Sequence, residues 1–167
     1  PTPNTSSAAS DVYKRQVSDF DEEGEVPTCS ANGTTLYYET AGDHGPPVVL
    51  VMGLRARGVA WTPIVERLRR SHRLVFFDHR GVGESAALTG PTSMTEMAGD
   101  AVALMDHLGW STAHLAGVSM GGMGALHAVL DHRPRFRSLA LVASTSHGRA
   151  TFRISPTGLW RYLGTMH

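Results

Sequence analysis

The sequence predicts an α/β fold whose mainly parallel sheet has an antiparallel hairpin at its N-terminal edge. From residue 48 onward, continuous apolar runs alternate with segments in which apolar residues recur at helical spacing. Such alternation is typical of parallel strands joined by right-handed helical crossovers. Ahead of these segments, Asn32-Gly33 separates two strand-like runs, and this dipeptide is the strongest short signal for a hairpin.

The first elements are the hairpin and a buried strand. Residues 26–31 and 35–40 are the expected hairpin strands. The run at 48–52 is apolar at every position, which predicts a strand covered on both faces. Thr62 is expected to cap the next helix, because Pro63 suits a first helical position.

The middle of the chain supplies a strand, a glycine-rich turn and a long helix. Residues 73–77 predict the next buried strand, and residues 78–85 predict a turn after it. Ser93 and Glu96 have the spacing of a capping box, which marks a helix start. We expect this helix to end at Gly109.

The last elements surround a G-x-S-x-G motif centred on Ser119. Residues 113–117 predict the strand before it, and residues 138–144 predict a final buried strand. The helix between them should be amphipathic, with an apolar face formed by Met123, Leu126, Val129 and Leu130.

This setting of strand, motif and helix predicts a sharp turn that presents the Ser119 hydroxyl to a cleft. Gly117 and Gly121 are the small residues that a crowded turn requires. The Met120 N–H would then lie at a helix start, where unpaired amides and the helix dipole favour negative charge.

Together with two loops, the motif resembles the N-terminal half of an α/β-hydrolase-fold protein. The loops are Met52-Gly53-Leu54, after the first parallel strand, and the turn at 78–85. The resemblance covers residues 26–145. It is to the branch of esterases, enol-lactone hydrolases and perhydrolases.

The resemblance implies a serine hydrolase that acts on a small ester or lactone through an acyl-enzyme intermediate. Ser119 would be the nucleophile, and the backbone N–H groups of Leu54 and Met120 would form the oxyanion hole. Gly53 would permit the turn that presents Leu54. Relatives that open epoxides or remove halide have aspartate at the motif, so a serine favours acyl transfer. Perhydrolysis, carbon–carbon bond hydrolysis and a non-catalytic ligand-binding protein of the same fold stay open as alternatives.

The chain offers few partners for this serine. In the family the order is Ser, then Asp or Glu, then His, but Asp131 is the only carboxylate after Ser119. Asp131 lies in the helix that leaves the motif, so we expect it to point away from the cleft. His127 and His132 are on the same helix, and we expect them to face solvent or to pack. His147 is the candidate for a substitute base, although a histidine in a cap-entry loop is the preferred interpretation for it. We therefore expect the triad acid and histidine to be absent from a truncated chain that is inactive alone.

Several other residues have structural interpretations that we prefer to functional ones. We expect the turn at 78–85 to brace the loop below the site, and Trp61 to pack in the core. Arg55 and Arg57 could meet an anionic substrate, but a solvated surface is the preferred interpretation.

Composition excludes several classes of protein. The formal net charge is zero at pH 7, so no charged field predicts binding to nucleic acid or an anionic membrane. Cys29 is the only cysteine, which rules out an internal disulfide. No apolar run reaches membrane-spanning length, no Cys/His metal spacing or G-x-G-x-x-G occurs, and we expect no cofactor. A cytoplasmic location is the expected default.

Three segments follow from this interpretation. Residues 1–20 are expected to be a disordered, non-native tail, because 7–16 resemble translated sequencing-adaptor sequence. Residues 21–147 would form the N-terminal part of the hydrolase domain. Residues 148–167 would begin a cap or a cut-off segment.

Overall fold

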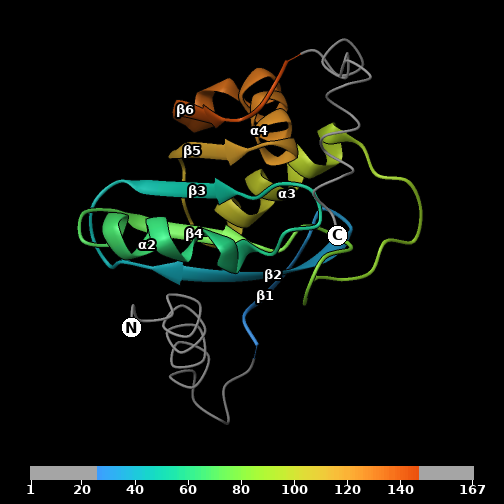
Figure 1. Cartoon of the computed structure of the whole chain (residues 1–167), viewed down its shortest axis with the longest axis horizontal. Coiled ribbons are helices and arrows are strands. Elements are labelled where there is room, and N and C mark those ends of the chain that lie inside the picture. Colours follow the sequence, from blue (N-terminus) through green and yellow to red (C-terminus); the bar gives the residue numbers. More distant parts are fainter. Residues whose placement is uncertain (1–25, 147–167) are drawn as a thin grey trace, which may run out of the picture.

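The structure is a computed structural model that describes residues 26–146. In this part of the chain, six strands form one sheet (Figure 1). The strands are β1 (Thr28–Ala31), β2 (Thr34–Ala41), β3 (Pro47–Val51), β4 (Arg73–Phe77), β5 (Ala113–Val118) and β6 (Phe136–Val142). Their order across the sheet is β1-β2-β4-β3-β5-β6. Strands β4, β3, β5 and β6 are parallel, whereas β1 and β2 pair antiparallel at one edge. The predicted fold class is confirmed.

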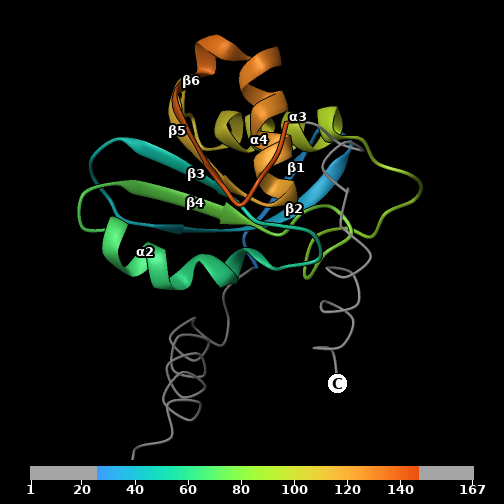
Figure 2. The same ribbon diagram turned by 45° about the horizontal axis from the view of Figure 1, so that its top comes forward.

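Helices cover both faces of this sheet. They are η1 (Gly58–Trp61), α2 (Thr62–Leu68), α3 (Met94–His107), α4 (Met120–Asp131) and η2 (Arg133–Arg135). In Figures 1 and 2, α2 lies against one face of the sheet, and α3 and α4 lie against the other. Within the described residues, no helix combines the length and the apolar character needed to cross a bilayer.

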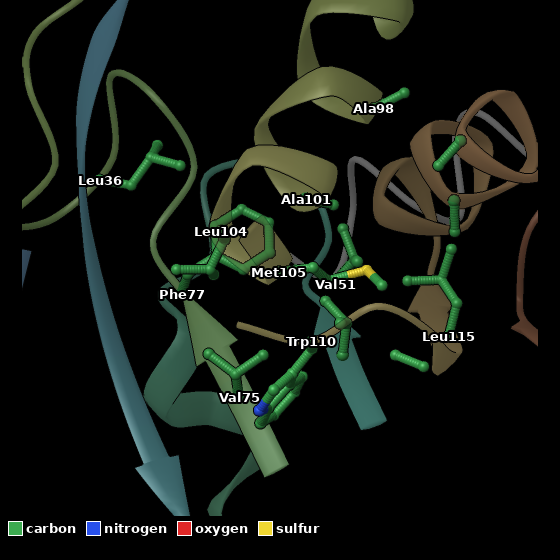
Figure 3. Close-up of a cluster of buried hydrophobic side chains, with 14 of the residues drawn as sticks. Leu36, Val51, Val75, Phe77, Ala98, Ala101, Leu104, Met105, Trp110 and Leu115 are labelled. Atoms are coloured by element: carbon green, nitrogen blue, oxygen red, sulfur yellow. The ribbon is translucent and has the colours of Figure 1, made fainter. Parts of the chain in front are cut away.

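The buried strands divide their side chains between two apolar clusters, as strands covered on both faces must. On the α3–α4 side, Val51, Phe77 and Leu115 pack with Leu104 and Met105 of α3 (Figure 3). The second cluster, on the α2 side, consists of Val48, Leu50, Met52, Trp61, Val65, Leu74 and Phe76. The carboxyl ends of β3, β4 and β5 therefore project from a layer that is packed on both sides.

Local signals placed the hairpin turn and the α3 start correctly. Asn32 and Gly33 have φ angles of 51° and 72°, the left-handed pair that a two-residue hairpin turn requires. The capping box is confirmed, since the Glu96 N–H donates to Ser93 Oγ at 3.1 Å and the Ser93 N–H donates to the Glu96 carboxylate at 2.8 Å.

The predicted cap at Thr62 is wrong. Thr62 is already the first residue of α2, because η1 leads directly into this helix, and its hydroxyl donates to the Val59 carbonyl at 2.6 Å. The last strand begins at Phe136, two residues before the predicted start at Ser138, and ends at Val142. It is not the buried strand that the sequence predicts, because five of its seven residues are exposed where it forms the edge of the described sheet.

The predicted apolar face of α4 is also wrong, except at Val129, which packs against the core. Leu130 is 69% exposed, and Met123, Leu126 and Val129 are only half-buried. The buried residues are small: Gly121, Gly122, Gly124, Ala125 and Ala128. Small side chains let the helix backbone approach the sheet closely, and this approach overrides the spacing of the larger apolar residues.

A buried carboxylate ties the hairpin turn to α3 and to the turn after β4. Asp100 of α3 is fully buried. Arg80 Nε donates to its Oδ2 at 2.7 Å, and Asn32 Nδ2 donates to its Oδ1 at 2.8 Å. Arg80 also donates to the Asn32 carbonyl at 3.2 Å, so the three residues form one network.

We predict that Asp100→Asn lowers the free energy of unfolding by about 3 kcal/mol, because it leaves Arg80 without its buried charged partner. Asp106→Asn on the same helix is the matched control. Asp106 is 62% exposed and pairs with Arg135, so its loss should cost at most about 1 kcal/mol. Urea denaturation of both variants measures the difference, and equal losses would contradict the prediction.

Candidate active site

Ser119 occupies a strained turn between β5 and α4. Its φ of 53° and ψ of −123° are unusual for a residue with a side chain. The residue is exposed, although the residues around it are largely buried or half-buried. The predicted strand–turn–helix setting of this serine is therefore present, with its side chain on the surface at the carboxyl end of the sheet.

The main chain of Ser119 is held from both sides. Its N–H donates to the Val142 carbonyl at the end of β6 at 2.9 Å. Its carbonyl accepts hydrogen bonds from the Ser144 hydroxyl at 2.8 Å and from the Gly122 N–H at 3.0 Å. A strained conformation persists only where its surroundings over-determine it, and these contacts do so.

The motif glycines are required by close backbone approach. A Cβ atom on Gly117 would lie 2.5 Å from the Gly121 carbonyl oxygen, which no real side chain tolerates. A Cβ atom on Gly121 would overlap the carbonyl oxygens of Val51 and Met52. The first turn of α4 therefore rests directly on the backbone where β3 ends.

The loop after β3 lies against Ser119. A Cβ atom placed on Gly53 would be 3.3 Å from Ser119 Cβ and 3.9 Å from its Oγ. The Ala56 N–H donates to the Gly53 carbonyl at 3.3 Å, closing a turn in which Arg55 has a φ of 58°. Residues more than sixty positions apart in the sequence thus meet at one point.

Two backbone amides near this point are unpaired. In the described part of the chain, no hydrogen bond is formed by the N–H of Leu54 or of Met120. Met120 is the first residue of α4, so its amide has no partner inside the helix. An anion at this helix start would be favoured by the Met120 N–H and by the helix dipole.

The turn at 78–85 is structural, as expected. Asp78 is fully buried and accepts hydrogen bonds from the N–H groups of Gly58 at 2.7 Å and Glu84 at 3.1 Å. The Ser85 hydroxyl donates to the Asp78 carbonyl at 2.6 Å. Arg57 departs from the expected solvated surface, because its Nε donates to the Asp78 carboxylate at 3.1 Å.

Sequence reasoning missed one residue in this turn. His79 is almost fully buried, and its Nε2 lies 2.8 Å from the carbonyl oxygen of Met52. Burial lowers the pKa of this imidazole, despite opposing contributions from the Met52 carbonyl and from Asp100 and Asp78. No signal in the sequence indicated that a histidine two residues after a buried strand would contact the loop that follows the neighbouring strand.

The remaining candidates stay away from Ser119 or outside the described residues. Asp131 ends α4, about 16 Å along the helix axis from Met120 at 1.5 Å per residue. His127 is exposed on the same helix. His147 lies outside the described residues, as do the predicted tail at 1–20 and the predicted cap or cut-off segment at 148–167. Trp61 is buried in the α2-side cluster, in agreement with a packing role.

Comparisons with known proteins agree with this geometry. A family model described as alpha/beta hydrolase fold matches residues 46–166. A protein of Azorhizobium caulinodans named "Putative carbamate hydrolase RutD" is 36% identical over 117 residues, which cover 70% of this chain and 44% of that protein. 3-Oxoadipate enol-lactonase 1 of Acinetobacter baylyi is 30% identical over 115 residues, which cover 68% of this chain and 43% of that protein.

Solved structures are similar as well. The enol-lactonase from Burkholderia xenovorans LB400 matches with a TM-score of 0.69 and 33% identity, over 71% of this chain and 46% of that one. A thermophilic esterase from Thermogutta terrifontis matches with a TM-score of 0.68 and 31% identity, over 74% of this chain and 47% of that one. The chain spans less than half the length of each of these relatives.

We predict that Gly121→Ala lowers the free energy of unfolding by about 1–3 kcal/mol, because the added methyl would overlap the Val51 and Met52 carbonyls. Gly124→Ala, in the same helix, is the matched control. Its Cβ would lie 3.9 Å from Met97 Cβ, an ordinary contact. That variant should be neutral or stabilised by up to about 1 kcal/mol, since alanine favours a helix interior. Thermal unfolding measures the Tm of both variants, and an equal change in Tm for Gly121→Ala and Gly124→Ala would contradict the prediction.

Proposed function

Because the chain belongs to the alpha/beta hydrolase fold family, we propose that Ser119 is the nucleophile of a hydrolase that works through an acyl-enzyme. The observation that carries the proposal is the strained, exposed conformation of Ser119 between β5 and α4. In this arrangement the hydroxyl would attack a carbonyl carbon, its proton passing to a base, and the carbonyl oxygen would become negatively charged.

We propose that the unpaired amides of Leu54 and Met120 bind this oxyanion. The contact between Gly53 and Ser119 supports the proposal, because it brings the loop that presents Leu54 to the serine. Donors that are already in place when charge develops stabilise the transition state more than the substrate. Each such donor is typically worth about 3–4 kcal/mol of the activation barrier.

We propose that the triad acid and histidine belong to a part of the complete protein that follows this segment. The short span of the chain relative to its relatives supports this. Two features of β6 also support it. The strand lies at the edge of the described sheet, and its apolar residues Leu141 and Val142 are 45% and 50% exposed. An apolar, unpaired edge is an aggregation hazard that proteins normally cover.

The proposed substrate is a small ester or lactone. The names of the relatives specify a carbamate hydrolase and an enol-lactonase. Carbamates and lactones share a carbonyl group bonded to a heteroatom that can leave, which is the group that a serine nucleophile with an oxyanion hole attacks.

We predict that the complete protein is labelled covalently by a fluorophosphonate probe, whereas its Ser119→Ala variant is not. The Ser119 oxygen would form the bond to phosphorus as fluoride leaves. Ser111→Ala is the matched control, because Ser111 is exposed at the opposite end of β5 and should leave labelling unchanged. Gel fluorescence measures the labelling, and equal signals from wild type and Ser119→Ala would refute the assignment of the nucleophile.

The 167-residue chain expressed alone should hydrolyse p-nitrophenyl acetate no faster than its Ser119→Ala variant, because it would lack the base. Release of p-nitrophenol, followed by absorbance, measures this. Turnover well above that of the variant would show that this chain supplies its own base, and would direct attention to His147.

A further inference from the structure

We propose that His79 is a positioning residue that holds the Met52 carbonyl and thereby orients the oxyanion-binding loop that begins at Gly53. This inference rests on the proposed function of Ser119 and the Leu54 amide. It assigns a role to a buried histidine that is neither the nucleophile nor an oxyanion donor.

The hydrogen bond between His79 and Met52 determines the tautomer. Nε2 lies 2.8 Å from a carbonyl oxygen, which can only accept, so Nε2 carries the proton and donates. Nδ1 is buried and has no partner among the described residues. It is therefore an unprotonated nitrogen, since an N–H buried without an acceptor would be costly.

The surroundings keep this imidazole neutral and in place. The ring is 1% exposed and makes an edge contact with Phe77, with centroids 5.3 Å apart and planes at 74°. Burial lowers its pKa, and the nearby carboxylates of Asp78 and Asp100 oppose this effect without reversing its direction. The ring thus acts as a fixed neutral donor rather than as a proton carrier.

The Met52 carbonyl is also confined by α4. A Cβ atom on Gly121 would overlap the Met52 oxygen, so this oxygen lies close against the helix backbone. The peptide group between Met52 and Gly53 is planar. Holding its oxygen between His79 and Gly121 therefore also fixes the direction of the Gly53 N–H.

The hold on the Met52 carbonyl matters because Gly53, the next residue, is flexible. Glycine has the widest backbone freedom of any residue, and Gly53 lies between the held peptide and the Leu54 amide. Gly53 cannot gain a side chain without crowding Ser119 Cβ. The loop must therefore be restrained on both sides of Gly53. The Ala56 N–H holds the Gly53 carbonyl at 3.3 Å, and the hydrogen bond from His79 to Met52 restrains the peptide that precedes Gly53.

The test compares His79→Leu and His79→Gln in the complete protein with an ester substrate. His79→Leu removes the donor and should lower kcat about tenfold or more at nearly unchanged KM, because oxyanion binding acts in the transition state. His79→Gln retains an amide donor and should restore kcat to within about threefold of wild type. Leu104→Ala is the control for stability. It opens a cavity in the apolar cluster on the α3–α4 side of the sheet, so it should lower Tm and leave kcat unchanged.

A His79→Leu variant with kcat within twofold of wild type would overturn the proposal, provided that Ser119→Ala is inactive in the same assay. Loss of activity in Ser119→Ala thus separates failure of this inference from failure of the proposed function. If His79→Leu does not fold, His79→Gln and nitrogen-15 NMR of the wild-type imidazole decide. A proton on Nδ1 alone, or a kcat of His79→Gln below a tenth of the wild-type value, would overturn the proposed role of His79. A proton on Nε2 of the wild-type imidazole, together with a kcat of His79→Gln within about threefold of wild type, would support it.

Discussion

The close contact between the first turn of α4 and the backbone at the end of β3 is the constraint on which the site depends. Gly121 lies so near the carbonyl oxygens of Val51 and Met52 that even a methyl group would overlap them. Because interiors are densely packed and resist deformation, this contact makes the serine turn and the loop after β3 one rigid unit. The position of Gly53 beside Ser119 follows from it.

The strain at Ser119 is supported by a different part of the sheet. Its main chain is held by the Val142 carbonyl at the end of β6 and by the Ser144 hydroxyl two residues further along the chain. The same strand forms the sheet edge among the described residues. Any element that paired with this edge would therefore also affect the conformation of Ser119.

Local signals predicted the elements well where a short-range interaction decides them. The Asn32-Gly33 turn and the Ser93–Glu96 capping box depend on neighbouring residues, and both are present. The buried face of α4 could not be predicted in this way. Helical spacing favoured larger residues such as Leu126 and Leu130, but the distance between helix and sheet selects small ones. That distance is set by contacts with β3 and β5, which are remote in the sequence.

The order of strands and helices along the chain can be read from the residues alone, and so can the serine between glycines at a strand–helix junction. What surrounds that serine depends on how the strands pair in the folded sheet. Gly53 reaches it because β3 and β5 are parallel neighbours whose carboxyl ends coincide. His79 reaches Met52 because β4 flanks β3 on the other side. Strand pairing joins residues that are far apart along the chain. The residues next to either partner in the sequence therefore do not show which strand will lie beside it.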